Sequence, residues 1–162
     1  MQSTESGVVI LACGNPSRGD DAIGPLLLER LRTWLKANTT PLPVTCIDEF
    51  QFQPENALDL DGQRLALFID ASLTAPAPYR LSRLAPAHDP SYTTHAMSPA
   101  AVLHVHAQVG RTPAPDGWQL AIRGEAFELG AEPSPAALDH LAQAERLVQR
   151  MCMAPDGWEE AM

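Results

Sequence analysis

The sequence predicts an α/β fold: a single three-layer α/β/α domain with a mostly parallel, twisted sheet of about five strands. Two observations support this prediction. Short apolar segments alternate with amphipathic, helix-like segments along most of the chain, as in domains where helices connect parallel strands. The first and third apolar segments are also continuous, which is typical of strands that helices cover on both faces.

Five segments have the character of strands. Residues 7–13 (GVVILAC) form a continuous apolar run followed by Gly14-Asn15-Pro16, which predicts a central strand that ends in a loop. Residues 64–70 (RLALFID) repeat this character and end in a carboxylate. The other expected strands are residues 43–50, residues 118–124 and, with the alternation of an edge strand, residues 79–84.

Helices are predicted between these strands. Residues 22–36 carry apolar side chains at helical spacing, and Asp20 or Asp21 is well placed to cap this helix. Two later helices are expected to begin at Ser98-Pro99 and Ser134-Pro135. In both, serine occupies the N-cap position and proline the first helical position, where its missing N–H costs nothing.

The length of 162 residues fits one domain, which we expect to span residues 1–153. Residues 154–162 (APDGWEEAM) are expected to form a loose tail. No apolar stretch approaches the ~20 residues of a membrane helix, and the N-terminus lacks the features of a signal peptide. The sequence therefore predicts a cytoplasmic protein with no membrane partner.

The net charge and the lysine and cysteine content argue against several kinds of partner and site. Twenty acidic against eleven basic residues give a net charge of −9, which argues against nucleic-acid binding. Lys36 is the only lysine, and its position excludes a Walker A motif. Three cysteines without paired spacing indicate neither a disulfide framework nor a zinc knuckle.

Three polar features are expected at the carboxyl ends of the strands, where open α/β sheets bind ligands. They are the loop containing Asp20 and Asp21, then Asp70 at the end of its strand, and His95 just before the helix that begins at Ser98. Two carboxylates and an imidazole are suitable ligands for a borderline divalent ion such as nickel, zinc or iron.

Each of these features also has a purely structural interpretation. Asp21 could cap the first helix, Asp70 could form a turn, and His95 could be a solvated loop residue. The glycine-containing loop could instead bind phosphate, although two adjacent aspartates would repel an anion there. The residues taken one by one leave these alternatives open.

Other catalytic chemistry is disfavoured. Cys13 and Cys46 lie in apolar strands and are expected to be small core residues, not nucleophiles. No Gly-x-Ser-x-Gly motif is present. His104 and His106 are two residues apart in a predicted helix, so they do not share a face and are not expected to bind a metal together.

Four motifs occur in a fixed order between about residues 7 and 150. They are Gly14-Asn15-x-x-x-x-Asp20-Asp21-x-x-Gly24, residues 67–71 (LFIDA), residues 94–99 (THAMSP) and residues 127–130 (FELG) followed by Ser134-Pro135. Together they resemble the hydrogenase maturation endopeptidases, which trim the C-terminus of the large subunit of nickel-iron hydrogenases.

The resemblance implies an endopeptidase that removes the C-terminal extension of a nickel-loaded hydrogenase large-subunit precursor. Asp21, Asp70 and His95 match the family's nickel-contacting, catalytic residues, and Asp20 is expected to orient a ligand or cap a helix. The nickel is implied to be carried by the substrate and not held permanently by the enzyme. It could position the scissile bond, polarise its carbonyl or activate water.

Two features depart from the family pattern. The first acidic ligand is often glutamate in the family, whereas Asp21 is shorter, and Pro16-Ser17-Arg18 replaces residues that are often apolar.

Two other functions are alternatives to the endopeptidase. One is a non-catalytic nickel-binding chaperone or sensor, and the other is a metallohydrolase that acts on small molecules.

Overall fold

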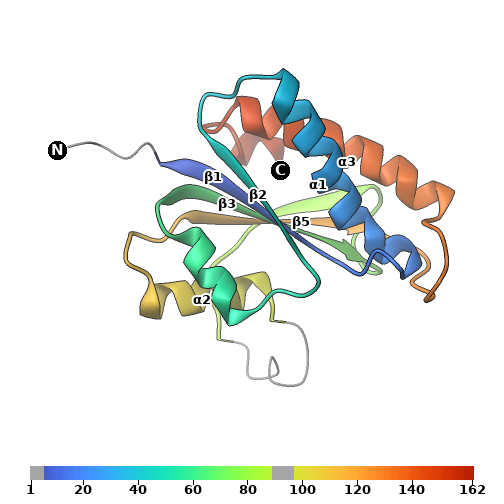
Figure 1. Cartoon of the computed structure of the whole chain (residues 1–162), viewed down its shortest axis with the longest axis horizontal. Coiled ribbons are helices and arrows are strands. Elements are labelled where there is room, and N and C mark those ends of the chain that lie inside the picture. Colours follow the sequence, from blue (N-terminus) through green and yellow to red (C-terminus); the bar gives the residue numbers. More distant parts are fainter. Residues whose placement is uncertain (1–5, 89–96) are drawn as a thin grey trace.

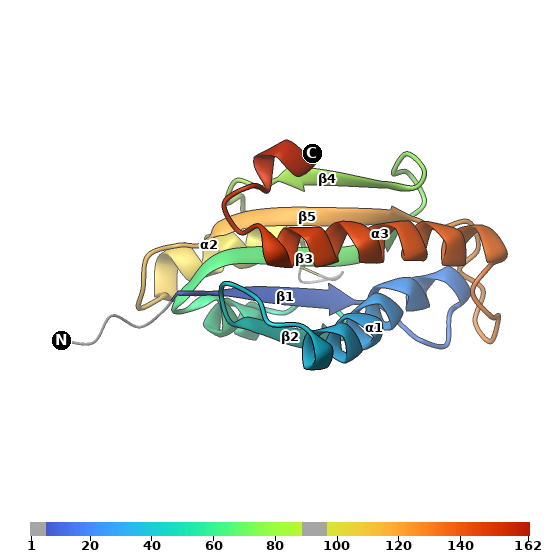
Figure 2. The same ribbon diagram turned by 90° about the horizontal axis from the view of Figure 1, so that it is seen from above.

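Five strands form one sheet in the computed structural model, which describes residues 6–88 and 97–162. The strand order is β2-β1-β3-β5-β4, and only β4 runs antiparallel to its neighbour (Figure 2). The strands are β1 (Gly7–Cys13), β2 (Val44–Glu49), β3 (Gln63–Ser72), β4 (Tyr79–Arg83) and β5 (Asp116–Arg123). This is the mostly parallel sheet that the sequence predicts, with residues 79–84 at one edge as expected.

Helices cover both faces of the sheet (Figure 1). α1 (Ile23–Ala37) and α3 (Pro135–Met153) lie on one face, and α2 (Pro99–Val109) lies on the other with the 3-10 helix η2 (Pro54–Leu60). The remaining 3-10 helices are η1 (Gly19–Ala22), directly before α1, and η3 (Glu159–Ala161). The predicted three-layer architecture is therefore confirmed. No helix within the described ranges has both the length and the apolar character to cross a membrane.

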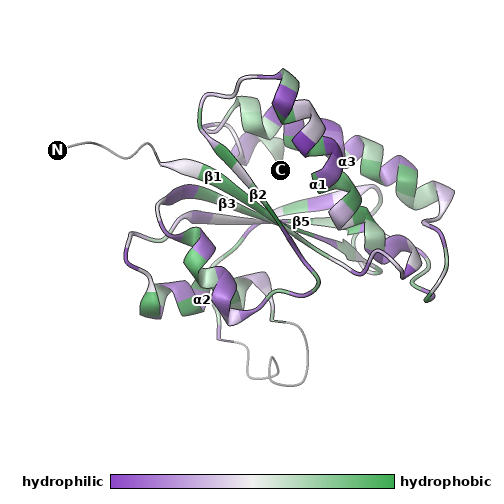
Figure 3. Cartoon of the chain, viewed as in Figure 1, coloured by the Kyte–Doolittle hydropathy of each residue, from purple (hydrophilic) through white to green (hydrophobic). Residues whose placement is uncertain are grey.

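The sheet divides the core into two parts, as the inner strand β1 illustrates. Val8, Ile10 and Ala12 pack against α1 and α3, whereas Val9 and Leu11 pack on the side of α2. Successive side chains of a strand point to opposite faces, so a strand between two helical layers must be apolar throughout. Figure 3 shows this as hydrophobic strands in the middle of the molecule, with hydrophilic residues on the outer sides of the helices.

Serine side chains cap α2 and α3 as predicted. The Ser98 hydroxyl accepts a hydrogen bond from Ala101 N at 3.1 Å, and the Ser134 hydroxyl accepts one from Ala137 N at 3.2 Å. The prediction that Asp20 or Asp21 caps the helix of residues 22–36 is wrong, because neither side chain, nor any other among the described residues, caps α1. Its first turn continues from η1, which contains both aspartates.

The segment after Met153 is packed and not loose as expected. Trp158 is 2% exposed, and its indole Nε1 donates a hydrogen bond to Met151 O at 2.9 Å. Its ring packs edge to face against that of Trp118, with 6.0 Å between the ring centroids. Arg83 Nη1 also donates to Glu159 Oε1 at 2.8 Å. The large apolar area of one tryptophan is enough to hold a short segment against the sheet.

We predict that Trp158→Ala lowers the free energy of unfolding by about 3–5 kcal/mol, the usual effect of removing a buried tryptophan side chain. Urea denaturation monitored by circular dichroism measures this change. The control is Met162→Ala, because Met162 is 65% exposed and its truncation should have little effect. Equal stability of the two variants would show that the tail does not contribute to the fold.

Candidate active site

Asp21 and Asp70 both lie at the carboxyl ends of neighbouring central strands. β1 and β3 are parallel, and Ala12 of β1 pairs with Ile69 of β3. The next residues of the two strands, Cys13 and Asp70, therefore lie side by side. Asp21 lies in η1, which directly follows the loop after β1. β3 continues to Ser72, past the end predicted at Asp70, because its last residues pair with β5. The structure thus brings together two of the three residues that the sequence predicts.

The loop after β1 returns close to its own starting point. A side chain at Gly14, which has φ +156°, would place its Cβ only 2.0 Å from Asp21 O. At Gly24 a Cβ would lie 2.7 Å from Cys13 O. Asn15 N then donates to Asp21 Oδ2 at 2.8 Å, which orients this carboxylate. The two glycines of the first motif therefore allow the close approach that positions Asp21.

Asp20 is completely buried and accepts four hydrogen bonds. Ser134 N donates to Oδ1 at 2.6 Å, while the Ser134 hydroxyl, Glu125 N and Ala126 N donate to Oδ2 at 2.8, 2.7 and 3.0 Å. Burial raises the pKa of Asp20, but these hydrogen bonds outweigh it and hold the pKa below its ordinary value. Asp20 therefore connects η1 to the segment between β5 and α3.

The pKa of Asp70 is raised to about 6. Burial is the main cause, a hydrogen bond with the Gln119 side chain opposes it, and the nearby Asp21 charge adds to it. Within the described residues, the buried oxygen Oδ1 of Asp70 has no hydrogen-bond partner. A buried carboxylate oxygen without a donor is costly to ionise in isolation, but a cation brought beside it would stabilise its charge.

Cys13 packs against the core on the side of α2, as expected, but it is not fully enclosed there. It is only half-buried and lines a cavity of about 210 Å³ beside Asp21. The other residues that line this cavity are Gly14, Asn15, Arg18, Phe50 and Gln51. Burial and then the charges of Asp70, Asp21 and Glu49 raise the pKa of the Cys13 thiol strongly, so it stays protonated at neutral pH. The prediction that it is not a thiolate nucleophile agrees with this environment.

His95 lies outside the described residues, so its role as a nickel contact stays a prediction. Across residues 6–88 and 97–162, no three histidine, cysteine, aspartate or glutamate side chains are grouped so that they could hold a metal ion. His106 is buried and pairs through Nε2 with Asp61 Oδ1 at 2.9 Å, whereas the His104 ring lies beside His88. The two histidines of α2 therefore occupy separate environments, as their spacing predicts.

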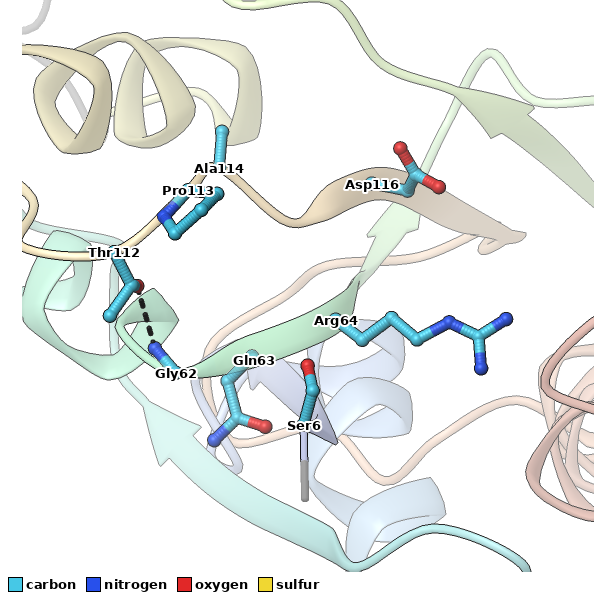
Figure 4. A pocket seen from close by; sticks show the side chains of 8 residues that line it. All are labelled: Ser6, Gly62, Gln63, Arg64, Thr112, Pro113, Ala114 and Asp116. Atoms are coloured by element: carbon cyan, nitrogen blue, oxygen red, sulfur yellow. Dashed lines mark hydrogen bonds between the residues drawn. The ribbon is translucent and has the colours of Figure 1, made fainter. Parts of the chain in front are cut away.

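A second cavity, of about 430 Å³, lies at the opposite, amino-terminal end of the strands (Figure 4). Its walls come from the starts of β1, β3 and β5 and from the segment after α2, and Thr112 Oγ1 accepts a hydrogen bond from Gly62 N at 2.8 Å. None of the described residues that line it is among those predicted to be functional. The chemistry expected from the sequence therefore belongs to the carboxyl end of the sheet.

Known structures share this architecture over nearly the whole chain. A [NiFe] hydrogenase maturation protease, HycI from Thermococcus kodakarensis, superimposes with a TM-score of 0.67 at 22% identity, covering 91% of this chain and 92% of that chain. The hydrogenase maturating endopeptidase HybD from E. coli gives 0.66 at 22% identity, covering 90% and 91%. An endopeptidase from E. coli gives 0.68 at 19% identity, covering 93% and 94%.

The chain has the fold of the hydrogenase maturation proteases. No family model and no curated protein matches its sequence. The maturation-protease fold places the first acidic motif and Asp70 at one end of a parallel sheet, where open α/β domains bind their ligands.

We predict that Asp20→Ala lowers the free energy of unfolding by at least about 2 kcal/mol, because it leaves several buried donors without an acceptor. The control is Asp139→Ala, since Asp139 is an exposed acid on α3. Because the folded-state pKa of Asp20 is lowered, its stabilisation is present above the unfolded pKa and is lost as pH falls through the folded pKa. Urea denaturation from pH 3 to pH 7 should therefore show that the difference between wild type and variant shrinks at the acidic end.

Asp70→Asn should have the opposite effect on stability. The pKa of Asp70 rises on folding from 3.8 to about 6, so ionised Asp70 destabilises the fold at neutral pH. We expect the variant to gain on the order of 3 kcal/mol at pH 7, with the gain disappearing below about pH 4, where Asp70 is protonated in both states. Thermal unfolding at pH 3.5 and pH 7 measures both effects. A variant that is less stable than wild type at pH 7 would contradict this account.

Proposed function

We propose that this protein is an endopeptidase that removes the C-terminal extension of a nickel-iron hydrogenase large-subunit precursor after nickel insertion. The observation that carries the proposal is the proximity of Asp21 and Asp70 at the carboxyl end of the sheet, together with one buried oxygen of Asp70 that has no hydrogen-bond partner among the described residues. The motif resemblance and the shared fold of the named maturation proteases support the same reaction. The proposed place of action is the cytoplasm.

The nickel is proposed to belong to the substrate. Two carboxylates, together with the predicted His95, suit Ni(II), and substrate-bound nickel would supply the positive charge that stabilises ionised Asp70. Asp21 is already oriented by Asn15 N, so it would meet the incoming metal without rearrangement. The nickel of the substrate would thus offset the negative charges of Asp21 and Asp70.

The reaction itself is peptide hydrolysis by water. The C–N bond breaks, water supplies the hydroxyl of the new carboxylate, and the leaving amine takes up a proton. Nickel beside the scissile bond would polarise its carbonyl or activate the water. The thiol of Cys13 is protonated and surrounded by negative charge, so a covalent thioester route is disfavoured.

The test is incubation of the purified protein with nickel-loaded precursor, followed by mass spectrometry of the precursor C-terminus. Wild type should remove the extension, nickel-free precursor should stay intact, and Asp21→Asn and Asp70→Asn should each reduce the rate at least about a hundredfold, as expected for lost charge stabilisation in a reaction centre. Asp139→Asn is the control with unchanged rate.

Two outcomes would overturn the proposal. Efficient cutting of nickel-free precursor would exclude recognition of the metal. Tight binding of the nickel-loaded precursor without any mass change would favour the non-catalytic chaperone.

A further inference from the structure

One edge of the sheet lies next to the candidate active site. Within the described residues, β2 pairs only with β1. Its contacts with β1 include the hydrogen bonds from Val8 N to Pro43 O at 2.8 Å and from Gly14 N to Glu49 O at 3.1 Å. Pro43 and Glu49 therefore turn their carbonyls toward β1.

The backbone of Asp48 faces away from β1. In a parallel ladder the N–H and C=O of one residue point to the same side, and neighbouring residues alternate, so Cys46 and Asp48 turn their polar groups outward. The hydrogen bond from Arg32 Nη2 to Cys46 O at 3.1 Å agrees with this direction. Arg32 thus covers the edge at Cys46, while the polar backbone of Asp48 has no outward hydrogen bond among the described residues and can accept an added strand.

A groove of about 430 Å³ runs beside this open position. It is lined by Gly14, Pro16, Pro25, Glu29, Arg32, Asp48, Glu49 and Phe50. Gly14 and Phe50 also line the cavity that contains Asp21. The groove therefore borders the cavity of the candidate active site, so a chain lying in it would pass beside Asp21.

The lining of the groove has both an apolar and an acidic part. Phe50 is 61% exposed and lies with two prolines on the groove wall. Arg32, the only cation among the described residues that line the groove, is already paired with Asp48. The Glu29 carboxylate is exposed and has no ion pair among the described residues, so the groove carries excess negative charge.

We propose that an extended segment of the precursor binds as an added strand at the free edge of β2, through the backbone of Asp48. An apolar side chain of this segment packs on Phe50, and a basic side chain meets Glu29. Strand addition suits a substrate tail, because backbone hydrogen bonds hold it extended while a few side-chain contacts supply selectivity. This inference rests on the proposed function and identifies how that function selects its substrate.

The backbone contact is tested by comparing Asp48→Pro with Asp48→Ala in precursor cleavage. Both variants lose the pair with Arg32, but only proline removes the outward N–H, and an edge strand accepts proline at such a position. The KM of Asp48→Pro should exceed that of Asp48→Ala about fivefold, the effect of one lost hydrogen bond, with equal kcat. Equal KM values for two folded variants would overturn strand addition.

A second measurement does not depend on the folding of the proline variant. Amide hydrogen exchange of Asp70→Asn, mixed with nickel-loaded precursor, should show slower exchange at Asp48 N than the same protein alone. Unchanged exchange at Asp48 in a complex shown to be fully bound would overturn the proposal.

The side-chain contacts are tested with matched controls. Glu29→Gln and Phe50→Ala should raise KM about fivefold, as expected for one lost charged or apolar contact of about 1 kcal/mol. Glu160→Gln and Val109→Ala, which are exposed and lie on other elements, should not. If wild type does not cut the precursor, the proposed function fails; if wild type cuts but these variants match their controls, only the groove proposal fails.

Discussion

The buried carboxylate of Asp20 is the interaction on which the arrangement of the site depends. One side chain holds the segment between β5 and α3, including the N-cap residue of α3, against the turn that contains Asp21. A buried carboxylate is tolerable only because hydrogen-bond donors satisfy both of its oxygens. The short 3-10 helix η1 contains both Asp20 and Asp21. The hydrogen bonds of Asp20 therefore also hold the backbone of Asp21, the aspartate with the proposed functional role, in place.

Asp70 has the opposite electrostatic character. It too is surrounded by protein, but one oxygen has no partner in the described structure, and the Asp21 charge lies close enough to raise its pKa further. Such a group reduces stability unless something positive approaches it. The described residues thus satisfy both carboxylate oxygens of Asp20 with hydrogen-bond donors but leave one oxygen of Asp70 without any.

Access to these groups is set by the position of β2 at the edge of the sheet. Because β1 is an inner strand and β2 is outermost, the groove at the end of β2 reaches the loop after β1 from the side. Arg32 protects part of this edge from unwanted pairing, as charged side chains commonly do on edge strands. The backbone of Asp48, at the end of β2 nearest the candidate active site, has no such hydrogen bond among the described residues.

The sequence by itself determined the elements and the two carboxylates. Continuous apolar runs gave the buried strands, Ser-Pro pairs gave two helix starts, and the rule that ligands gather at strand ends placed Asp21 and Asp70 together. The strands and helix starts depend on residues close in sequence, which a local pattern records, and the strand-end rule is a general property of open α/β sheets. Only the tertiary structure decided that Asp20 binds residues 105 to 114 positions away, that Trp158 anchors the tail, and that Cys13 lines a cavity. Those outcomes depend on which strands become neighbours and which helix ends meet, and no local pattern of residues contains that information.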